Sequence, residues 1–150
     1  MKTILMFLSV SLVLINCGGG SSPKIDKSAK ELLDGKTFYE ALCINNSQGE
    51  DKTLYSSYNF KKNKLTINYY SDENFSKKSS SKVYNITSYY DDGFNLSKKD
   101  SKYECSLSSL ESNFIMVNCV NTSNKAKEID TIDFNAYDNK KDALNNGSCN

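Results

Sequence analysis

The titratable side chains of this sequence favour binding over catalysis. Histidine, whose ordinary pKa lies nearest to neutral pH, does not occur in the chain, so neither a Ser-His nor a Cys-His catalytic pair can form. Adjacent carboxylates, which could act as an acid and a base, occur at Asp72-Glu73 and Asp91-Asp92. Both pairs lie in predicted loops or turns, and the second lacks the further oxygen ligands of an EF-hand loop. We therefore predict a protein that is not an enzyme and needs no cofactor or metal.

Cys17 closes an apolar run at the start of the chain. Lys2 precedes the run from Ile4 to Ile15, which is typical of a secretory signal and short for a membrane span. The segment Leu14-Ile15-Asn16-Cys17 resembles the lipobox of bacterial lipoproteins. The resemblance implies that residues 1–16 are a cleaved signal peptide and that Cys17 is diacylated as the new N-terminus. The alternative is an ordinary signal peptide with a cysteine at this position by chance.

The residues after Cys17 have the composition of a tether. Gly18-Gly19-Gly20-Ser21-Ser22 is flexible and polar, so residues 17–27 would hold a domain away from a bilayer. Gly18 stands where an aspartate would retain a lipoprotein at the inner membrane, which favours transfer to the outer membrane. We expect a lipid-anchored protein of the bacterial cell envelope, attached to the outer membrane and facing the periplasm or the cell surface.

The charge balance argues against nucleic acid as a partner. Without Lys2, 18 of the 19 basic residues remain against 18 acidic ones, so the mature chain is formally neutral before its termini are counted. Lysines are interleaved with acids, whereas binding a polyanion needs a basic surplus. The expected partners are the membrane, through the lipid, and either a small hydrophobic ligand or an envelope protein.

The other four cysteines fit a disulfide-bonded domain. If Cys17 carries lipid, an even set remains, and an exported chain meets an oxidising compartment; the set is Cys43, Cys105, Cys119 and Cys149. Four cysteines allow three pairings. A zinc site is the competing interpretation, but the sequence has no C-x-x-C pair and no histidine. Two disulfides are the default expectation.

Period-two alternation of apolar residues predicts short antiparallel strands from residue 37 onward. A two-residue turn at Lys62-Asn63 would place Phe60 opposite Leu65 and every apolar side chain of the hairpin on one face. Short helices are predicted at both ends of the domain. Ser28-Ala29-Lys30-Glu31 has the pattern of a capping box. Near the other end, Asp138 could cap a helix that Gly147 ends.

A hairpin late in the chain indicates how the cysteines pair. A three-residue loop at Glu111-Ser112-Asn113 makes Leu107 face Val117 and brings Cys105 opposite Cys119. Directly opposed residues of an antiparallel pair have Cβ atoms roughly 4.5–5.5 Å apart, near the distance that a disulfide requires. By elimination, the two remaining cysteines form the other disulfide.

Residues 71–82 are predicted to form a long, mobile loop of serine, lysine and acidic residues. Within it, Asp72-Glu73-Asn74-Phe75-Ser76 matches the extended acceptor of bacterial N-glycosylation, an Asn-x-Ser sequence with an acid two residues before the asparagine. Asn85 and Asn95 also begin Asn-x-Ser/Thr sequences but lack that acid. Asn74 is therefore a candidate glycosylation site. The alternative is coincidence in a chain rich in asparagine and serine.

The strands and their mostly local connections predict the fold class. About seven or eight short strands form an all-β, mainly antiparallel meander with a short helix at each end. Such meanders close into a small up-and-down β-barrel or fold as a sandwich, which removes exposed strand edges. We expect residues 28–150 to form a single β-barrel domain.

The start of this domain is similar to that of lipocalin-like proteins. In that family a short helix leads into a Gly-x-Trp-Tyr strand that closes the base of the barrel. Here Gly35, Phe38 and Tyr39 stand at comparable places, with one extra residue after the glycine. The resemblance implies a calyx that binds a small hydrophobic ligand.

Two binding functions fit this architecture. The first is a lipocalin-like carrier that accepts an apolar molecule in a pocket lined by residues such as Tyr58, Ile67 and Leu107. The second is an interaction or structural lipoprotein that acts through its surface, for example an inhibitor of a cell-wall hydrolase or an envelope assembly factor. An apolar cavity of a few hundred Å³ would favour the carrier, whereas an interior filled by tyrosines would favour surface action.

Overall fold

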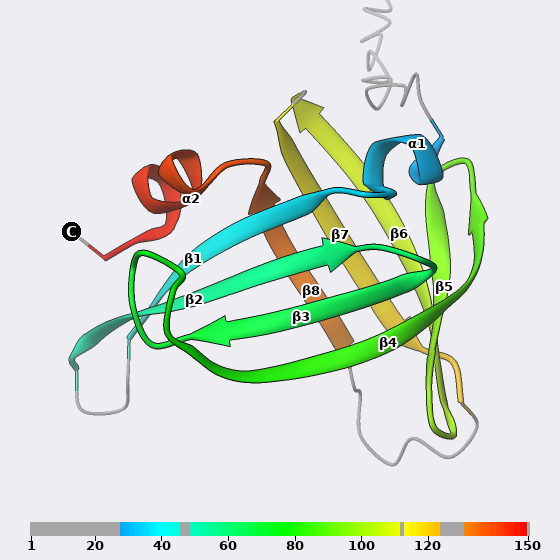
Figure 1. Ribbon diagram of the computed structural model, residues 1–150, viewed down its shortest axis with the longest axis horizontal. Helices are drawn as coiled ribbons and strands as arrows, with labels where there is room; N and C mark the ends of the chain where they lie inside the picture. Colours follow the sequence, from blue (N-terminus) through cyan, green and yellow to red (C-terminus); the bar gives the residue numbers. More distant parts are fainter. Residues whose placement is uncertain (1–27, 46–48, 112, 124–130, 150) are drawn as a thin grey trace, which may run out of the picture.

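Eight antiparallel strands form a closed barrel in the part of the chain that the computed structural model describes, residues 28–45, 49–111, 113–123 and 131–149 (Figure 1). Each strand pairs with the next, and the last pairs with the first. The elements are α1 (Ala29–Leu33), β1 (Thr37–Asn45), β2 (Asp51–Phe60), β3 (Lys64–Tyr70), β4 (Lys78–Tyr90), β5 (Gly93–Lys98), β6 (Ser101–Glu111), β7 (Phe114–Asn121), β8 (Thr131–Tyr137) and α2 (Lys140–Gly147). The predicted fold class is confirmed. The predicted signal peptide, the tether and Cys17 lie outside the described residues.

The β2–β3 hairpin has the register that its sequence predicts. Phe60 pairs with Leu65 and Tyr58 with Ile67. The two central residues of the turn, Lys62-Asn63, both have a φ of 54°, the left-handed conformation that suits the twist of a two-residue hairpin. The alternation of apolar residues therefore fixes the register, although Lys-Asn is a weak turn sequence.

The β6–β7 hairpin follows its predicted register except at its tip. Leu107 pairs with Val117, and Cys105 pairs with Cys119. At the tip Glu111 pairs with Phe114, so the predicted three-residue loop that begins at Glu111 is wrong. An irregularity between Ser108 and Glu111 adds one residue to β6 and shifts the register by one, as a β-bulge does.

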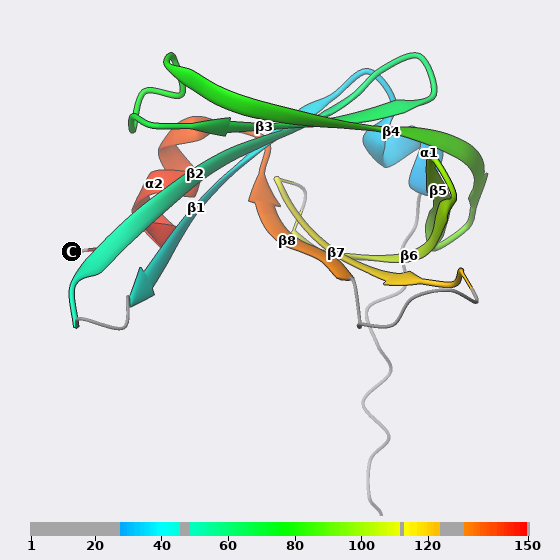
Figure 2. The same cartoon turned by 90° about the horizontal axis from the view of Figure 1, so that it is seen from below.

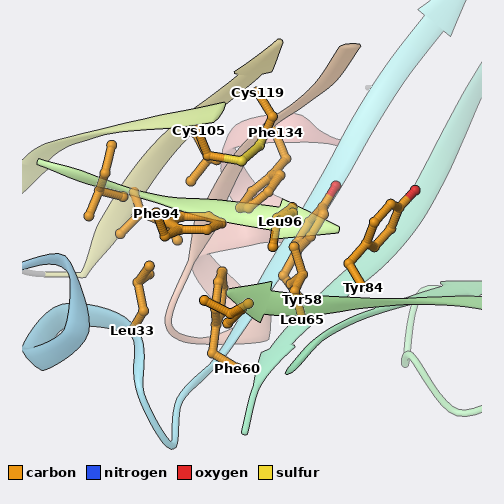
Figure 3. Close-up of a cluster of buried hydrophobic side chains, with 14 of the residues drawn as sticks. Leu33, Tyr58, Phe60, Leu65, Tyr84, Phe94, Leu96, Cys105, Cys119 and Phe134 are labelled. Carbon is orange, nitrogen blue, oxygen red and sulfur yellow. A yellow bond between two sulfur atoms is a disulfide. The ribbon is translucent and has the colours of Figure 1, made fainter. Parts of the chain in front are cut away.

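Inward-facing side chains of all eight strands fill the centre of the barrel (Figure 3). The largest fully buried side chains of the core are Phe60, Phe94, Leu65, Leu96 and Val117 of the strands, together with Leu33 of α1. The Cys105–Cys119 disulfide lies inside this core, with both cysteines fully buried. The core of this domain is therefore aromatic and aliphatic, with one covalent cross-link between neighbouring strands.

Helix α1 closes one end of the barrel. Ser28 and Glu31 form the predicted capping box, and Ala29 and Leu33 are fully buried in the core. Gly35 follows with a φ of +78°, a conformation that glycine adopts without strain, and its N–H donates to the carbonyl of Phe60 at 2.8 Å. The helix is thus fastened to β2 as a plug at this closed end.

Helix α2 packs against β1 on the outside of the barrel (Figure 1). Its N-cap is Asn139, not the predicted Asp138, because the Asn139 side chain accepts from the N–H of Asp142. The helix includes Gly147, where a Cβ would lie 1.7 Å from the carbonyl oxygen of Ala41, so only glycine permits this approach. Just beyond the helix, the predicted Cys43–Cys149 disulfide joins the end of the chain to β1.

The connection between β3 and β4 is shorter and more ordered than predicted. Residues 78–82 belong to β4 and pair with β3, so the prediction of a mobile loop through residue 82 is wrong. Backbone pairing with β3 extends the strand through a serine-rich stretch of low strand propensity. The remaining loop is held by the carboxylate of Asp72, which accepts from the N–H groups of Ser76 and Lys77.

The barrel is closed by a narrow seam between β1 and β8. Within the described residues these strands pair only at Tyr39 and Tyr137, whereas the other neighbouring strands share longer ladders. Beyond this pair β1 diverges from β8, and the β1–β2 hairpin projects beyond the rest of the barrel (Figures 1 and 2). The barrel consequently flares at the end opposite α1.

Candidate functional site

A hollow of about 540 Å³ lies at the flared end of the barrel, on the inner face of the projecting strands. We call it the mouth pocket. Its lining comes from β1, β2, β3, the start of β4 and β8, and consists of Glu40, Leu42, Lys52, Thr53, Leu54, Tyr55, Ser56, Tyr58, Tyr69, Tyr70, Ser71, Ser79 and Asp133. Its volume falls within the range of about 300–1,000 Å³ that is usual for small-molecule sites.

The wall of the mouth pocket that β1 and β2 form is apolar and accessible. Leu42 of β1 and Leu54 of β2 are direct cross-strand partners, and they are 48% and 40% exposed. Large apolar side chains of this exposure in a concave site favour an apolar ligand, because covering them removes their surface from water. Tyr69 adds an aromatic side chain that packs against the barrel core.

The floor of the mouth pocket is a glutamate carboxyl group hydrogen-bonded to a tyrosine hydroxyl. The hydroxyl of Tyr58 donates to Oε2 of Glu40 at 2.5 Å, and the backbone N–H of Asn135 donates to Oε1 at 2.9 Å. The Tyr58 ring stacks on Phe134 with centroids 3.8 Å apart. Glu40 therefore bridges β1 and β8 at the point where their backbone pairing ends, and Tyr58 braces it from β2.

Burial sets the protonation behaviour of this floor. Loss of solvent raises the pKa of Glu40, although the hydrogen bonds from Tyr58 and Asn135 act in the opposite direction. Burial and the nearby charge of Glu40 raise the pKa of Tyr58, so its hydroxyl stays a donor at physiological pH. The pair offers an incoming ligand one carboxyl group of unusually high proton affinity.

We expect Glu40→Gln to remove a pH dependence of stability from the domain. Between the ordinary carboxyl pKa of 4.5 and the raised value, the folded chain holds a proton that the unfolded chain has lost. Stability contributed by Glu40 is therefore full below 4.5 and falls as the pH rises through that interval. Urea unfolding over a pH series checks this. As the pH rises above 4.5, the free energy of unfolding of the wild type should fall relative to that of Glu40→Gln.

The exposed Glu104 on β6 supplies the control for this measurement. Glu104→Gln removes the same charge from an exposed position, so it measures how much of the difference comes from net charge alone. Parallel profiles for the wild type and Glu40→Gln would contradict the assignment of Glu40 as a buried, proton-binding bridge.

The residues predicted to line a ligand pocket separate in the structure. Tyr58 lies on the floor of the mouth pocket. Ile67 and Leu107 lie deeper, each 3% exposed within the packed core, and neither lines this pocket. Sequence reasoning missed Glu40 and Leu42, although Phe38, Glu40 and Leu42 alternate along one face of β1, and a carboxylate on that face is an available signal.

Asn74, the candidate glycosylation site, is exposed on the loop between β3 and β4. The carboxylate of Asp72 accepts from both the N–H and the hydroxyl of Ser76, at 3.1 and 2.7 Å. The acid and the serine of the acceptor sequence are thus joined across Asn74 in a closed turn, which a modifying enzyme would have to open. Glycosylation at Asn74 stays a prediction.

Comparisons of the chain with protein-family models, with curated proteins and with solved structures found no match. Among the residues that the structure describes, no three histidine, cysteine or acidic side chains gather to form a metal site. None of the helices in the same residues is long and apolar enough to cross a membrane.

Proposed function

We propose that this protein is a non-catalytic, envelope-anchored binding lipoprotein that holds a small amphipathic ligand in the mouth pocket. The observation that carries the proposal is the hollow of about 540 Å³ in which the exposed Leu42–Leu54 pair stands above the Glu40–Tyr58 floor. An apolar wall with a few convergent polar groups is the usual composition of a small-molecule site.

The lining indicates the chemistry of the ligand. Its apolar part would lie on Leu42, Leu54 and Tyr69, where contact removes apolar surface from water. A hydroxyl or ammonium group of the ligand would meet the carboxyl group of Glu40 on the floor, which accepts hydrogen bonds when ionised. The ligand class that fits is an apolar molecule with a hydrogen-bond-donating head.

The packed interior limits how deeply such a ligand can enter. Tyr58 stacks on Phe134 directly below the pocket, and Phe60, Phe94 and Leu96 fill the barrel beneath them (Figure 3). The ligand would therefore sit at the mouth and stay partly open to solvent. This is a shallower version of the calyx that the lipocalin resemblance implies.

The lipid anchor is the part of the proposal that rests on the sequence. The lipobox-like Leu14-Ile15-Asn16-Cys17 supports acylation of Cys17 and a place in the bacterial envelope. Metabolic labelling with a fatty-acid analogue tests it, since the wild type should carry label and Cys17→Ala should not. Label retained by Cys17→Ala would reject the anchor.

Binding of the proposed ligand should depend on the apolar wall of the mouth pocket. Native mass spectrometry of the full chain, purified from its own envelope, should show a small-molecule adduct on the wild type. Leu42→Asp should lose most of this adduct, because it places a charge where the apolar part of the ligand lies. Val120→Asp is the matched control: Val120 is 49% exposed, against 48% for Leu42, but lies on β7 outside the pocket.

The outcomes distinguish the two classes of binding function. An adduct that survives Leu42→Asp would contradict the mouth pocket as the ligand site. A wild type that carries no adduct and instead co-purifies with an envelope protein, in a manner that Leu42→Asp abolishes, would contradict the carrier. It would support a surface-acting inhibitor or assembly factor that uses the projecting β1–β2 hairpin (Figure 2).

A further inference from the structure

A second hollow, of about 250 Å³, lies on the outer face of the barrel over β1, β2 and β3. We call it the outer hollow. Its lining consists of Thr37, Tyr39, Ser57, Asn59, Thr66, Asn68, Tyr70, Phe75 and Lys140. Apart from Tyr70, its residues differ from those of the mouth pocket.

The first wall of the outer hollow is the loop between β3 and β4. Phe75, at its tip, has a φ of 54°, a conformation that costs a bulky residue energy and needs compensation. Its ring packs edge-on against Tyr39, Tyr55 and Tyr70, at centroid distances of 5.3, 5.7 and 5.6 Å, and Phe75 is 6% exposed. Four aromatic rings thus fix this wall over the sheet.

The second wall comes from helix α2. The ammonium of Lys140 donates to the carbonyl oxygen of Asn74 at 2.9 Å and lies 5.6 Å from the centroid of the Tyr39 ring. Among the described lining residues, Lys140 is the charged one. The helix thereby places a positive charge beside the loop wall, at the edge of the hollow.

The floor of the outer hollow is built from neutral polar side chains held in register. One row across the sheet is Thr37, Asn59 and Thr66. Asn59 Nδ2 donates to Thr37 Oγ1 at 2.7 Å, and in the next row Asn68 Nδ2 donates to Ser57 Oγ at 3.2 Å. These bonds fix the orientations of the amides before any ligand arrives.

The burial of this floor is unlike that of the outer face elsewhere. Outward residues of β6 and β7, such as Glu104 and Asn118, are exposed. On β1–β3 the outward Asn59, Thr66 and Asn68 are half-buried, and Ser57 is 2% exposed. Two walls over a sheet of neutral hydroxyls and amides form a recess whose groups can both donate and accept hydrogen bonds.

We propose that the outer hollow binds one unit of an acidic saccharide. Sugar hydroxyls both donate and accept, which matches the threonine hydroxyls and asparagine amides of the floor. Rings of Tyr39 and Tyr70 supply apolar surface for the C–H groups of a sugar, and Lys140 supplies a partner for its carboxylate. This site is independent of the ligand proposed for the mouth pocket.

Ligand-detected saturation-transfer NMR on the full chain in lipid nanodiscs tests the proposal, with glucuronate and glucose as probes. Glucuronate should bind, and glucose should bind about 3- to 10-fold more weakly because it lacks the charge. Thr66→Val keeps the side-chain shape and removes one hydroxyl, so it should weaken the binding of glucuronate by about 3- to 10-fold. Thr131→Val, on the exposed outer face of β8, is the matched control and should change nothing.

Lys140→Met tests the positive charge of the second wall. It should abolish the preference for glucuronate over glucose, and the thermal unfolding midpoint should fall only by the loss of the exposed hydrogen bond to the Asn74 carbonyl. Three results would each overturn the proposal. They are the absence of saturation transfer to either sugar, equal affinity of the wild type for the two sugars, and glucuronate binding that Thr66→Val leaves intact. None of these results bears on the adduct test of the mouth pocket.

Discussion

Replacing both cysteines of the Cys43–Cys149 disulfide by serine is expected to lower the free energy of unfolding by about 4–5 kcal/mol. The two cysteines are 106 residues apart in the sequence, so the bridge restricts nearly the whole domain when it is unfolded. Removing it lets the unfolded chain reach many more conformations, which lowers the relative stability of the folded state. Urea unfolding of wild type and Cys43→Ser/Cys149→Ser, both without reductant, measures the difference.

The same experiment contains an internal check. Without the bridge the unfolded chain is more expanded, so the dependence of the free energy on urea concentration should become steeper. Thr53→Val is the control, because Thr53 Oγ1 accepts from the N–H of Cys149 at 3.0 Å and so attaches the same segment non-covalently. That variant should lose only about 1 kcal/mol. A double-serine variant no less stable than Thr53→Val would contradict the chain-entropy explanation.

Phe60→Ala is expected to destabilise the domain by about 3–5 kcal/mol. The Phe60 ring is fully buried at the closed end of the barrel and contacts Phe38 and Phe94 edge-on, at centroid distances of 6.2 and 5.7 Å. Its backbone is fixed by bonds to Lys36 and Gly35, so the surroundings cannot easily collapse into the space that the ring leaves. Thermal or urea unfolding gives the loss directly.

Phe60→Leu distinguishes lost volume from lost aromatic character. It keeps most of the apolar volume, and its cost should stay below about 2 kcal/mol. Because Phe60 lies at the α1 end of the barrel, folded Phe60→Leu should carry the mouth-pocket adduct to the same extent as wild type. Equal destabilisation by alanine and leucine would show that the cavity is not the cause.

Local patterns made much of this fold predictable from the sequence. The registers around Lys62-Asn63 and at Cys105–Cys119 depend on nearby residues and on alternation, which leaves few alternatives once one face must be apolar. The capping box at Ser28 is local in the same way. Two of these features, the capping box and the first hairpin, agree with the structure in detail.

Features that depend on distant partners were not predictable in this way. The serine-rich start of β4 has low strand propensity and becomes a strand because β3 pairs with it. Leu42 is exposed because β1 diverges from β8 after Tyr39, a departure that the sequence of β1 does not signal. Glu40 takes its role from the N–H of Asn135, far along the chain. The mouth pocket is made by this divergence, so of the residues predicted to line a pocket only Tyr58 lies in it.

The position of α1 at the closed end has a consequence for how an anchored molecule would stand at a membrane. Residues 17–27, if they form the proposed tether, could span at most about 36 Å at about 3.3 Å per residue. The described chain begins at Ser28, next to α1, so an anchor at Cys17 would be joined to the domain at the end of the barrel opposite the mouth pocket. Under the proposed anchoring, the attachment point would not block the flared end, and a ligand could enter the mouth pocket from the aqueous compartment.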